Sequence, residues 1–180
     1  MEATLLKFIR NKDYFLIGFG LSKKFTLFNV ELNYTNSDFG NNIQNQGEFN
    51  LAYYPFGNSK LYSISKLAFV SQGEVKKVIY NQSVGLKINN WFYLEGKYSL
   101  GDQLNYSTNC GFLVYNTSDP IQTSGSLATK FYWKNLEICP FYIIDERMGS
   151  TFRYVTFTTT ELSNYKYLNH TFLTSIKWKF

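Results

Sequence analysis

The last stretch of the chain, Tyr167–Phe180, constrains the fold more than any other, because apolar and polar residues alternate along it. One face carries Phe172, Thr174, Ile176, Trp178 and Phe180, and the other carries Thr171, Ser175, Lys177 and Lys179. A repeat of two residues is the period of a β-strand. The stretch ends on the aromatic Phe180 itself, as a strand anchored at a membrane interface does. The sequence therefore predicts a closing β-strand with one apolar and one polar face.

This closing stretch resembles the last strand of Gram-negative outer-membrane β-barrel proteins, which typically finish on Phe with apolar residues at alternate positions before it. The resemblance implies an integral barrel in the cell outer membrane, in contact with outer-membrane lipid and lipopolysaccharide. Over the whole chain, the abundance of Tyr, Asn and Lys and the short connections resemble small barrels of the Bacteroidota lineage. Such barrels follow a periplasmic domain or accompany larger outer-membrane complexes, so a larger complex is a candidate partner.

The composition agrees with strands that have one wet and one apolar face. Aromatic residues make up 19% of the 180 residues, yet the mean hydropathy is only -0.24, because polar residues interrupt every apolar segment. No run reaches the roughly 18 to 20 apolar residues of a transmembrane helix, so any membrane span must be β. The chain is long enough for one domain, residues 1–180, and no linker divides it.

Apolar and polar residues alternate in successive segments, and no sustained helical periodicity is present. We therefore expect an all-β fold: an antiparallel up-and-down transmembrane β-barrel of about twelve strands, each of roughly ten residues. The expected strands are Leu5–Arg10, Tyr14–Leu21, Phe25–Thr35, Glu48–Phe56, Leu61–Ser71, Val78–Ile88, Trp91–Leu100, Leu104–Tyr115, Thr123–Trp133, Asn135–Ile144, Thr151–Thr158 and the closing strand, which Glu161–Tyr165 leads into. The first pair and the strand that contains Pro140 are the weakest of these, and a barrel of ten strands is the alternative.

The connections predict an orientation. The longest polar connection, Asn36–Asn45, is expected to be a surface loop, and Asp145–Gly149 is expected to be a turn. An even number of strands places both chain ends on one side. If the closing strand is that of an outer-membrane barrel, both termini are periplasmic and the Asn36–Asn45 loop lies outside the cell.

The polar faces of these strands would line the lumen. They bring carboxylates and cations together: Glu31, Glu48, Glu95 and Glu137 with Lys66, Lys87, Lys97, Lys130, Arg153 and Lys177. In a narrow barrel we expect these charges to pair across the interior and fill it, because an unpaired charge is costly there. The membrane-facing side would carry Phe172, Ile176, Trp178 and Phe180.

The filled lumen favours a structural or accessory subunit of an outer-membrane protein complex. Three alternatives stay open: a narrow, weakly anion-favouring pore, a lipid-modifying outer-membrane enzyme, and a soluble β-barrel binding protein. A soluble barrel is disfavoured because aromatic residues gather near the strand ends of the apolar face, as interfacial girdles require.

No catalytic, cofactor-binding or metal-binding residues are predicted. The enzymes of outer-membrane barrels that we can compare use a His followed two residues later by Ser, whereas Phe172 stands at that step after His170. A general base without its nucleophile cannot run that chemistry. Cys110, Cys139 and His170 have no ligand spacing, and the two cysteines are expected on opposite faces of strands that are not neighbours.

Two further features bear on location and partners. The cationic residues behind the net charge of +5 are scattered and build no basic run, so we expect no nucleic-acid partner. The start of the chain, MEATLLKFIRNKDYF, lacks the features of a secretory signal. Since an outer-membrane protein must be exported, we expect either a mature form with an added Met or the barrel part of a longer precursor.

Overall fold

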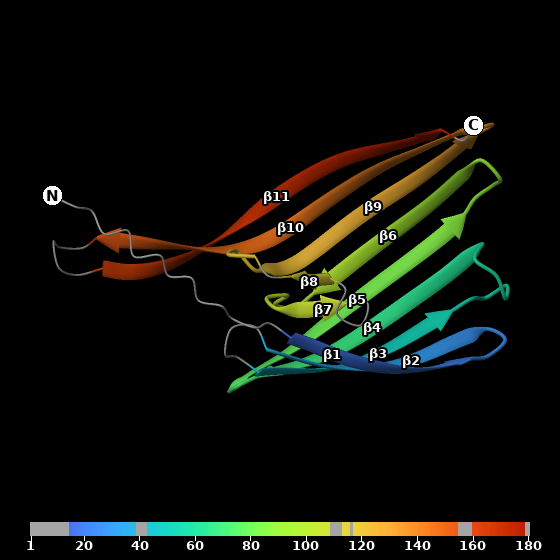
Figure 1. Ribbon diagram of the computed structural model, residues 1–180. Coiled ribbons are helices and arrows are strands. Elements are labelled where there is room, and N and C mark those ends of the chain that lie inside the picture. Colours follow the sequence, from blue (N-terminus) through green and yellow to red (C-terminus); the bar gives the residue numbers. More distant parts are fainter. Residues whose placement is uncertain (1–14, 39–42, 109–112, 116, 155–159, 179–180) are drawn as a thin grey trace, which may run out of the picture.

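The fold is an all-β meander. A computed structural model describes residues 15–38, 43–108, 113–115, 117–154 and 160–178 (Figure 1). Its strands are β1 (Phe15–Lys24), β2 (Phe28–Asp38), β3 (Ile43–Tyr53), β4 (Leu61–Gln72), β5 (Val75–Lys87), β6 (Phe92–Leu100), β7 (Tyr106–Thr108), β8 (Leu113–Tyr115), β9 (Ile121–Trp133), β10 (Leu136–Tyr154) and β11 (Thr160–Trp178). Nine of them form one antiparallel sheet in the order β1-β2-β3-β4-β5-β6-β9-β10-β11, and β7 pairs with β8 separately.

The predicted order of antiparallel hairpins is confirmed for this nine-stranded sheet. Each strand pairs with the strand before it in the chain, except that β9 follows β6 across the inserted β7–β8 hairpin. The sheet curls around this hairpin, and β1 and β11 are its two edges among the described residues (Figure 1). The expected strand Leu5–Arg10 lies outside the described residues.

The two faces of the sheet have opposite chemistry. Along β3 the side chains of Gln44, Gln46, Glu48 and Asn50 are buried, while those of Ile43, Phe49 and Tyr53 are exposed. The buried set points to the concave face, which is the face that the hairpin contacts. The exposed set points to the convex face. Along β3 the strand period therefore places polar groups inside and apolar groups outside, while on the adjacent β4 and β5 the buried Ala68, Val70 and Ile79 form a small apolar cluster with Tyr106 on the concave face.

The expected strand Leu104–Tyr115 is wrong. Its two ends form the short strands β7 and β8, which pair with each other and not with β6 or β9. The backbone leaves the sheet where Gly101 takes φ 115° and Asn105 takes φ 60°, both of which are left-handed conformations. The polar side chains of the segment find their partners on the concave face and not in the ladder.

Two predicted connections are also wrong. β2 continues to Asp38 and β3 begins at Ile43, so most of Asn36–Asn45 is strand, and its polar side chains Ser37 and Gln44 are buried on the concave face. The turn expected at Asp145–Gly149 is instead the middle of the 19-residue strand β10. There a register shift between Glu146 and Arg147 relative to β9 accommodates the irregular pattern that looked like a turn.

No helix among the described residues is long and apolar enough to cross a membrane.

Candidate functional site

The β7–β8 hairpin is held against the concave face by hydrogen bonds from β2 and β3. The Gln46 side chain accepts hydrogen bonds from the backbone N–H and the hydroxyl of Ser107, both at 3.1 Å, and donates to the Ser107 carbonyl. Gln44 donates to the Asn105 carbonyl at 2.8 Å, and the hydroxyls of Thr35 and Ser107 lie 3.3 Å apart. Because side-chain amides replace a strand ladder here, the hairpin is fixed without joining the sheet.

A buried carboxylate sits under this hairpin. Glu48 is 6% exposed and accepts hydrogen bonds from Asn50 at 2.8 Å, from the Tyr106 hydroxyl at 3.0 Å and from Asn33 at 3.5 Å. Burial, and then the nearby Glu48 charge, raise the pKa of Tyr106 far above its ordinary value, so the phenol stays protonated as a donor. Asn33 also donates to Glu31 at 2.8 Å, which joins the two carboxylates into one network.

A second polar cluster crosses the concave face nearer the turn between β5 and β6. The Tyr62 and Tyr93 hydroxyls lie 2.5 Å apart and both donate to Glu95, which also forms an ion pair with Lys97 at 2.8 Å. Gly85, which pairs with Glu95 across the β5–β6 ladder, makes room for them. A Cβ at this position would overlap the Tyr62 ring.

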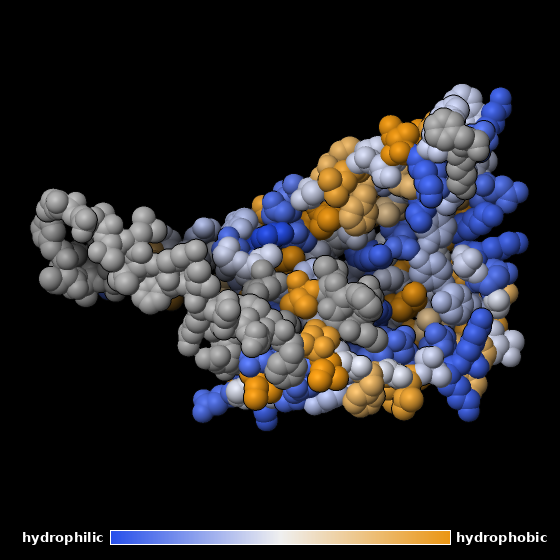
Figure 2. Space-filling model, viewed as in Figure 1, coloured by the Kyte–Doolittle hydropathy of each residue, from blue (hydrophilic) through white to orange (hydrophobic). Residues whose placement is uncertain are grey.

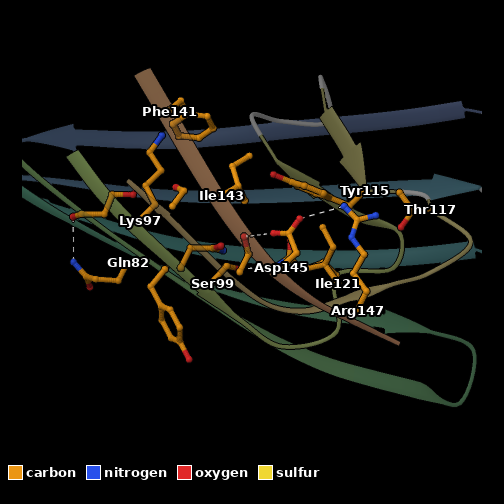
Figure 3. A pocket seen from close by; sticks show the side chains of 16 residues that line it. Gln82, Lys97, Ser99, Tyr115, Thr117, Ile121, Phe141, Ile143, Asp145 and Arg147 are labelled. Atoms are coloured by element: carbon orange, nitrogen blue, oxygen red, sulfur yellow. Dashed lines mark hydrogen bonds and ion pairs between the residues drawn. The ribbon is translucent and has the colours of Figure 1, made fainter. Parts of the chain in front are cut away.

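Between the Tyr62–Tyr93–Glu95–Lys97 cluster and the hairpin lies a cavity of about 500 Å³ (Figure 3). On its β9–β10 side, Asp145 accepts a hydrogen bond from Ser124 at 2.6 Å and forms an ion pair with Arg147 at 3.2 Å. Tyr115 of the hairpin, Phe141 and Ile143 add apolar surface, and Ser99 and Lys97 line the opposite wall. The cavity therefore has walls of mixed apolar and polar character, and its Asp145 and Arg147 compensate each other's charge.

The predicted lumen residues lie on the concave face but in separate clusters. Glu31 and Glu48 share the network under the hairpin, and Glu95 pairs with Lys97. Glu137 and Lys177 are register partners on β10 and β11, and the Cys139 thiol donates to Glu137 at 3.4 Å. Lys87 and Lys130 lie near the turns and line a different cavity, and Lys66 pairs in register with Asn50 and Asn81. The side chain of Arg153 lies outside the described residues.

The convex face carries the residues predicted to face the membrane. Phe172, Ile176 and Trp178 are 70%, 69% and 58% exposed, and Phe180 lies outside the described residues. The same face exposes large apolar side chains on every strand of the sheet, among them Ile17, Leu32, Phe49, Phe69, Val84, Leu100, Leu127 and Tyr142. The exposed apolar face therefore extends from the closing strand over all nine strands of the sheet.

Sequence reasoning missed Asp145, Arg147 and Tyr106 as concave-face residues. It placed the first two in a turn and the third in the expected strand Leu104–Tyr115. The signal that could have located Asp145 is the alternation Phe141, Ile143, Asp145 on the face opposite Tyr142 and Ile144. Tyr106 has no such signal, because its environment depends on residues 58 positions away.

The histidine and the acidic groups of the described residues lie apart from one another. His170 lies on the convex face, where its Nδ1 is 2.6 Å from the Tyr142 hydroxyl. Within the described ranges no three His, Cys, Asp or Glu side chains come together as a metal site. The geometry of this part of the chain supports hydrogen bonding and charge pairing on a concave face.

Comparisons with protein-family models, curated proteins and solved structures find no match to this chain.

Proposed function

We propose that this chain is an integral outer-membrane β-barrel that serves as a structural or accessory subunit of an outer-membrane protein complex. The observation that carries the proposal is the inversion of the two faces: polar and charged groups are buried on the concave face, and large apolar groups are exposed on the convex face. A soluble sheet of this size would have the reverse arrangement, because exposed apolar patches larger than a few hundred Å² are rare on soluble monomers.

Contact with lipid would remove the free-energy cost of exposing the apolar convex face to water. Apolar side chains on all nine strands would contact acyl chains, and aromatic residues near the strand ends, such as Trp133 and Trp178, would lie at the interfaces. The nine strands together with the expected strand Leu5–Arg10 would make ten, the smaller of the two predicted counts. In this proposal both termini are periplasmic, and the connection between β2 and β3 is on the cell surface.

The accessory role is favoured over transport because the interior is occupied. The β7–β8 hairpin takes up space next to β2 and β3, and the Tyr62–Tyr93–Glu95–Lys97 cluster crosses the face between two cavities. An open channel needs a continuous wet path, which these two elements obstruct. Among the described residues Glu95 pairs with Lys97 and Asp145 with Arg147, each on its own strand, whereas the buried Glu48 is held by hydrogen bonds from Asn33, Asn50 and Tyr106 and has no cationic partner.

Purification of the tagged chain in mild detergent from its native outer membrane, followed by mass spectrometry, tests the accessory role. We expect a larger membrane protein to be recovered at a fixed ratio to the barrel. Recovery of the barrel alone would contradict the accessory role without bearing on its membrane location.

A narrow, anion-favouring pore is the second candidate, and the lysines near one end of the concave face favour it. Planar-bilayer recording of the purified chain separates the two functions. The accessory role predicts no steady conductance, whereas the pore predicts small channels with a preference for chloride over potassium.

A further inference from the structure

The charges on the sheet are distributed unequally between its two ends. The end with the connections β1–β2, β3–β4, β5–β6 and β9–β10 is rich in lysine: Lys23, Lys24, Lys60, Lys87, Lys130, Lys134 and Lys177. At the opposite end two cations are paired with carboxylates, Lys77 with Asp102 and Lys166 with Glu146, both at 2.8 Å. Figure 2 shows hydrophilic side chains projecting from the lysine-rich end, on the right of the view.

A cavity of about 450 Å³ opens at this lysine-rich end, on the concave side. Its lining consists of Ser59, Tyr62, Lys87, Asn89, Asn90, Tyr93, Lys130 and Tyr132, and contains no carboxylate. The nearest carboxylates on this face are Glu95, which lies one concave-face row deeper and is already engaged by Lys97 and two tyrosines, and Glu137, which is the register partner of Tyr132 and of Lys177. The volume lies within the range of small-molecule sites.

The sheet register fixes how the two lysines of this cavity are placed. Lys87 on β5 pairs with Tyr93 on β6, and Tyr93 pairs with Lys130 on β9. The lysines therefore share one face on strands two apart, with their Cα atoms about 10 Å from each other. Lys130 lies over the Tyr93 ring at 5.5 Å, and among the described residues neither ammonium forms an ion pair.

We propose that this cavity binds a soluble small molecule that carries a phosphate group, held between Lys87 and Lys130. Lysine binds phosphate as a point charge, and two ammoniums that form no ion pair of their own among the described residues create a local positive potential that concentrates anions. The tyrosine rings provide surface for the rest of the ligand. A soluble ligand is favoured over a lipid headgroup because the cavity opens on the polar concave face, opposite the apolar convex face.

Isothermal titration of the detergent-solubilised full chain with inorganic pyrophosphate tests this site. We expect saturable binding that weakens at least about tenfold when Lys87→Gln and Lys130→Gln are combined, and by an intermediate factor in each single variant. Lys23→Gln is the matched control, because it removes the same charge from the same end but from the convex face; its affinity should stay within about twofold of the parent. The pair Lys87→Arg and Lys130→Arg should retain binding.

Two outcomes would overturn the proposal. The first is absent binding, or equal binding by the parent, the double Gln variant and the Lys23→Gln control. The second is displacement of pyrophosphate by short-chain phosphatidylglycerol added to the micelles, which would assign the cavity to a lipid headgroup. Neither result bears on membrane location, which fractionation tests separately.

Discussion

Phe49 and Glu48 are neighbours in the chain but lie in opposite environments. Phe49, on the convex face of β3, is 41% exposed, whereas Glu48, on the concave face, is 6% exposed and receives its hydrogen bonds from side chains. A soluble sheet would bury the phenylalanine and hydrate the carboxylate. The contrast between the two faces is what supports the proposal that the convex face meets an apolar surrounding and the concave face a polar interior.

The largest expected effect comes from a charged side chain placed at the centre of the convex face. Leu127 lies midway along β9 and is 49% exposed, so Leu127→Lys should destabilise the barrel in lipid by about 2 to 4 kcal/mol, because an ammonium would enter the middle of the bilayer. Urea unfolding in lipid vesicles measures it, with Leu127→Met as the control of similar volume. A tolerated lysine would mean that the convex face contacts water.

A somewhat smaller effect is expected on the concave face under the hairpin. Tyr106→Phe removes the 3.0 Å hydrogen bond to the buried Glu48 carboxylate and should cost about 1.5 to 3 kcal/mol. Tyr98→Phe is the matched control, because it deletes the same hydroxyl from the exposed convex face of β6 and should change stability by less than about 0.5 kcal/mol. Equal costs in the same unfolding assay would contradict the distinction between the faces.

Glu95→Gln should have a milder effect. The amide oxygen can still accept one tyrosine hydrogen bond, but the ion pair with Lys97 is lost, so we expect a cost of about 1 kcal/mol. The unpaired Lys97 should also raise the permeability of reconstituted vesicles to chloride. A variant with parental stability and no chloride flux would mean that this cluster does not close the interior.

The smallest effect is expected at the strand end of the convex face. Phe92 is the first residue of β6, next to the turn, and its ring stacks on Phe131 with centroids 4.9 Å apart. Phe92→Lys should cost only about 0 to 1 kcal/mol, because a lysine near the interface reaches water. Comparison with Leu127→Lys gives a depth profile, and a larger cost at Phe92 would refute the assumed position of the bilayer.

Much of the sheet was predictable because the pattern that specifies each strand and its two faces lies within the strand's own sequence. The alternation in Val78–Ile88, Trp91–Leu100 and Thr123–Trp133 reports both the strand and the face on which each residue lies. The segment with Tyr62, Ile64, Lys66 and Val70 on one face was ambiguous in sequence. The structure places these four on the concave face, where Lys66 is opposite Asn50 and Asn81.

The hairpin was not predictable because its partners are distant. Alternation from Leu104 to Tyr115 satisfies the pattern of a strand, and only contacts with Gln46 and Glu48, about sixty positions earlier, select the inward fold. The Asp145–Arg147 pair was missed for a related reason: a bulge in the β9–β10 ladder resembles a turn in sequence. The cavity beside Lys87 was missed because Lys87, Tyr93 and Lys130 come together only when β5, β6 and β9 are in register.

The central claim, that the convex face lies in the outer membrane, is tested most directly by fractionating cells that express the chain. We predict that it sediments with outer membranes, stays there after an alkaline carbonate wash, and needs detergent for release. Purification from the soluble fraction as a monodisperse monomer without detergent would contradict the membrane location.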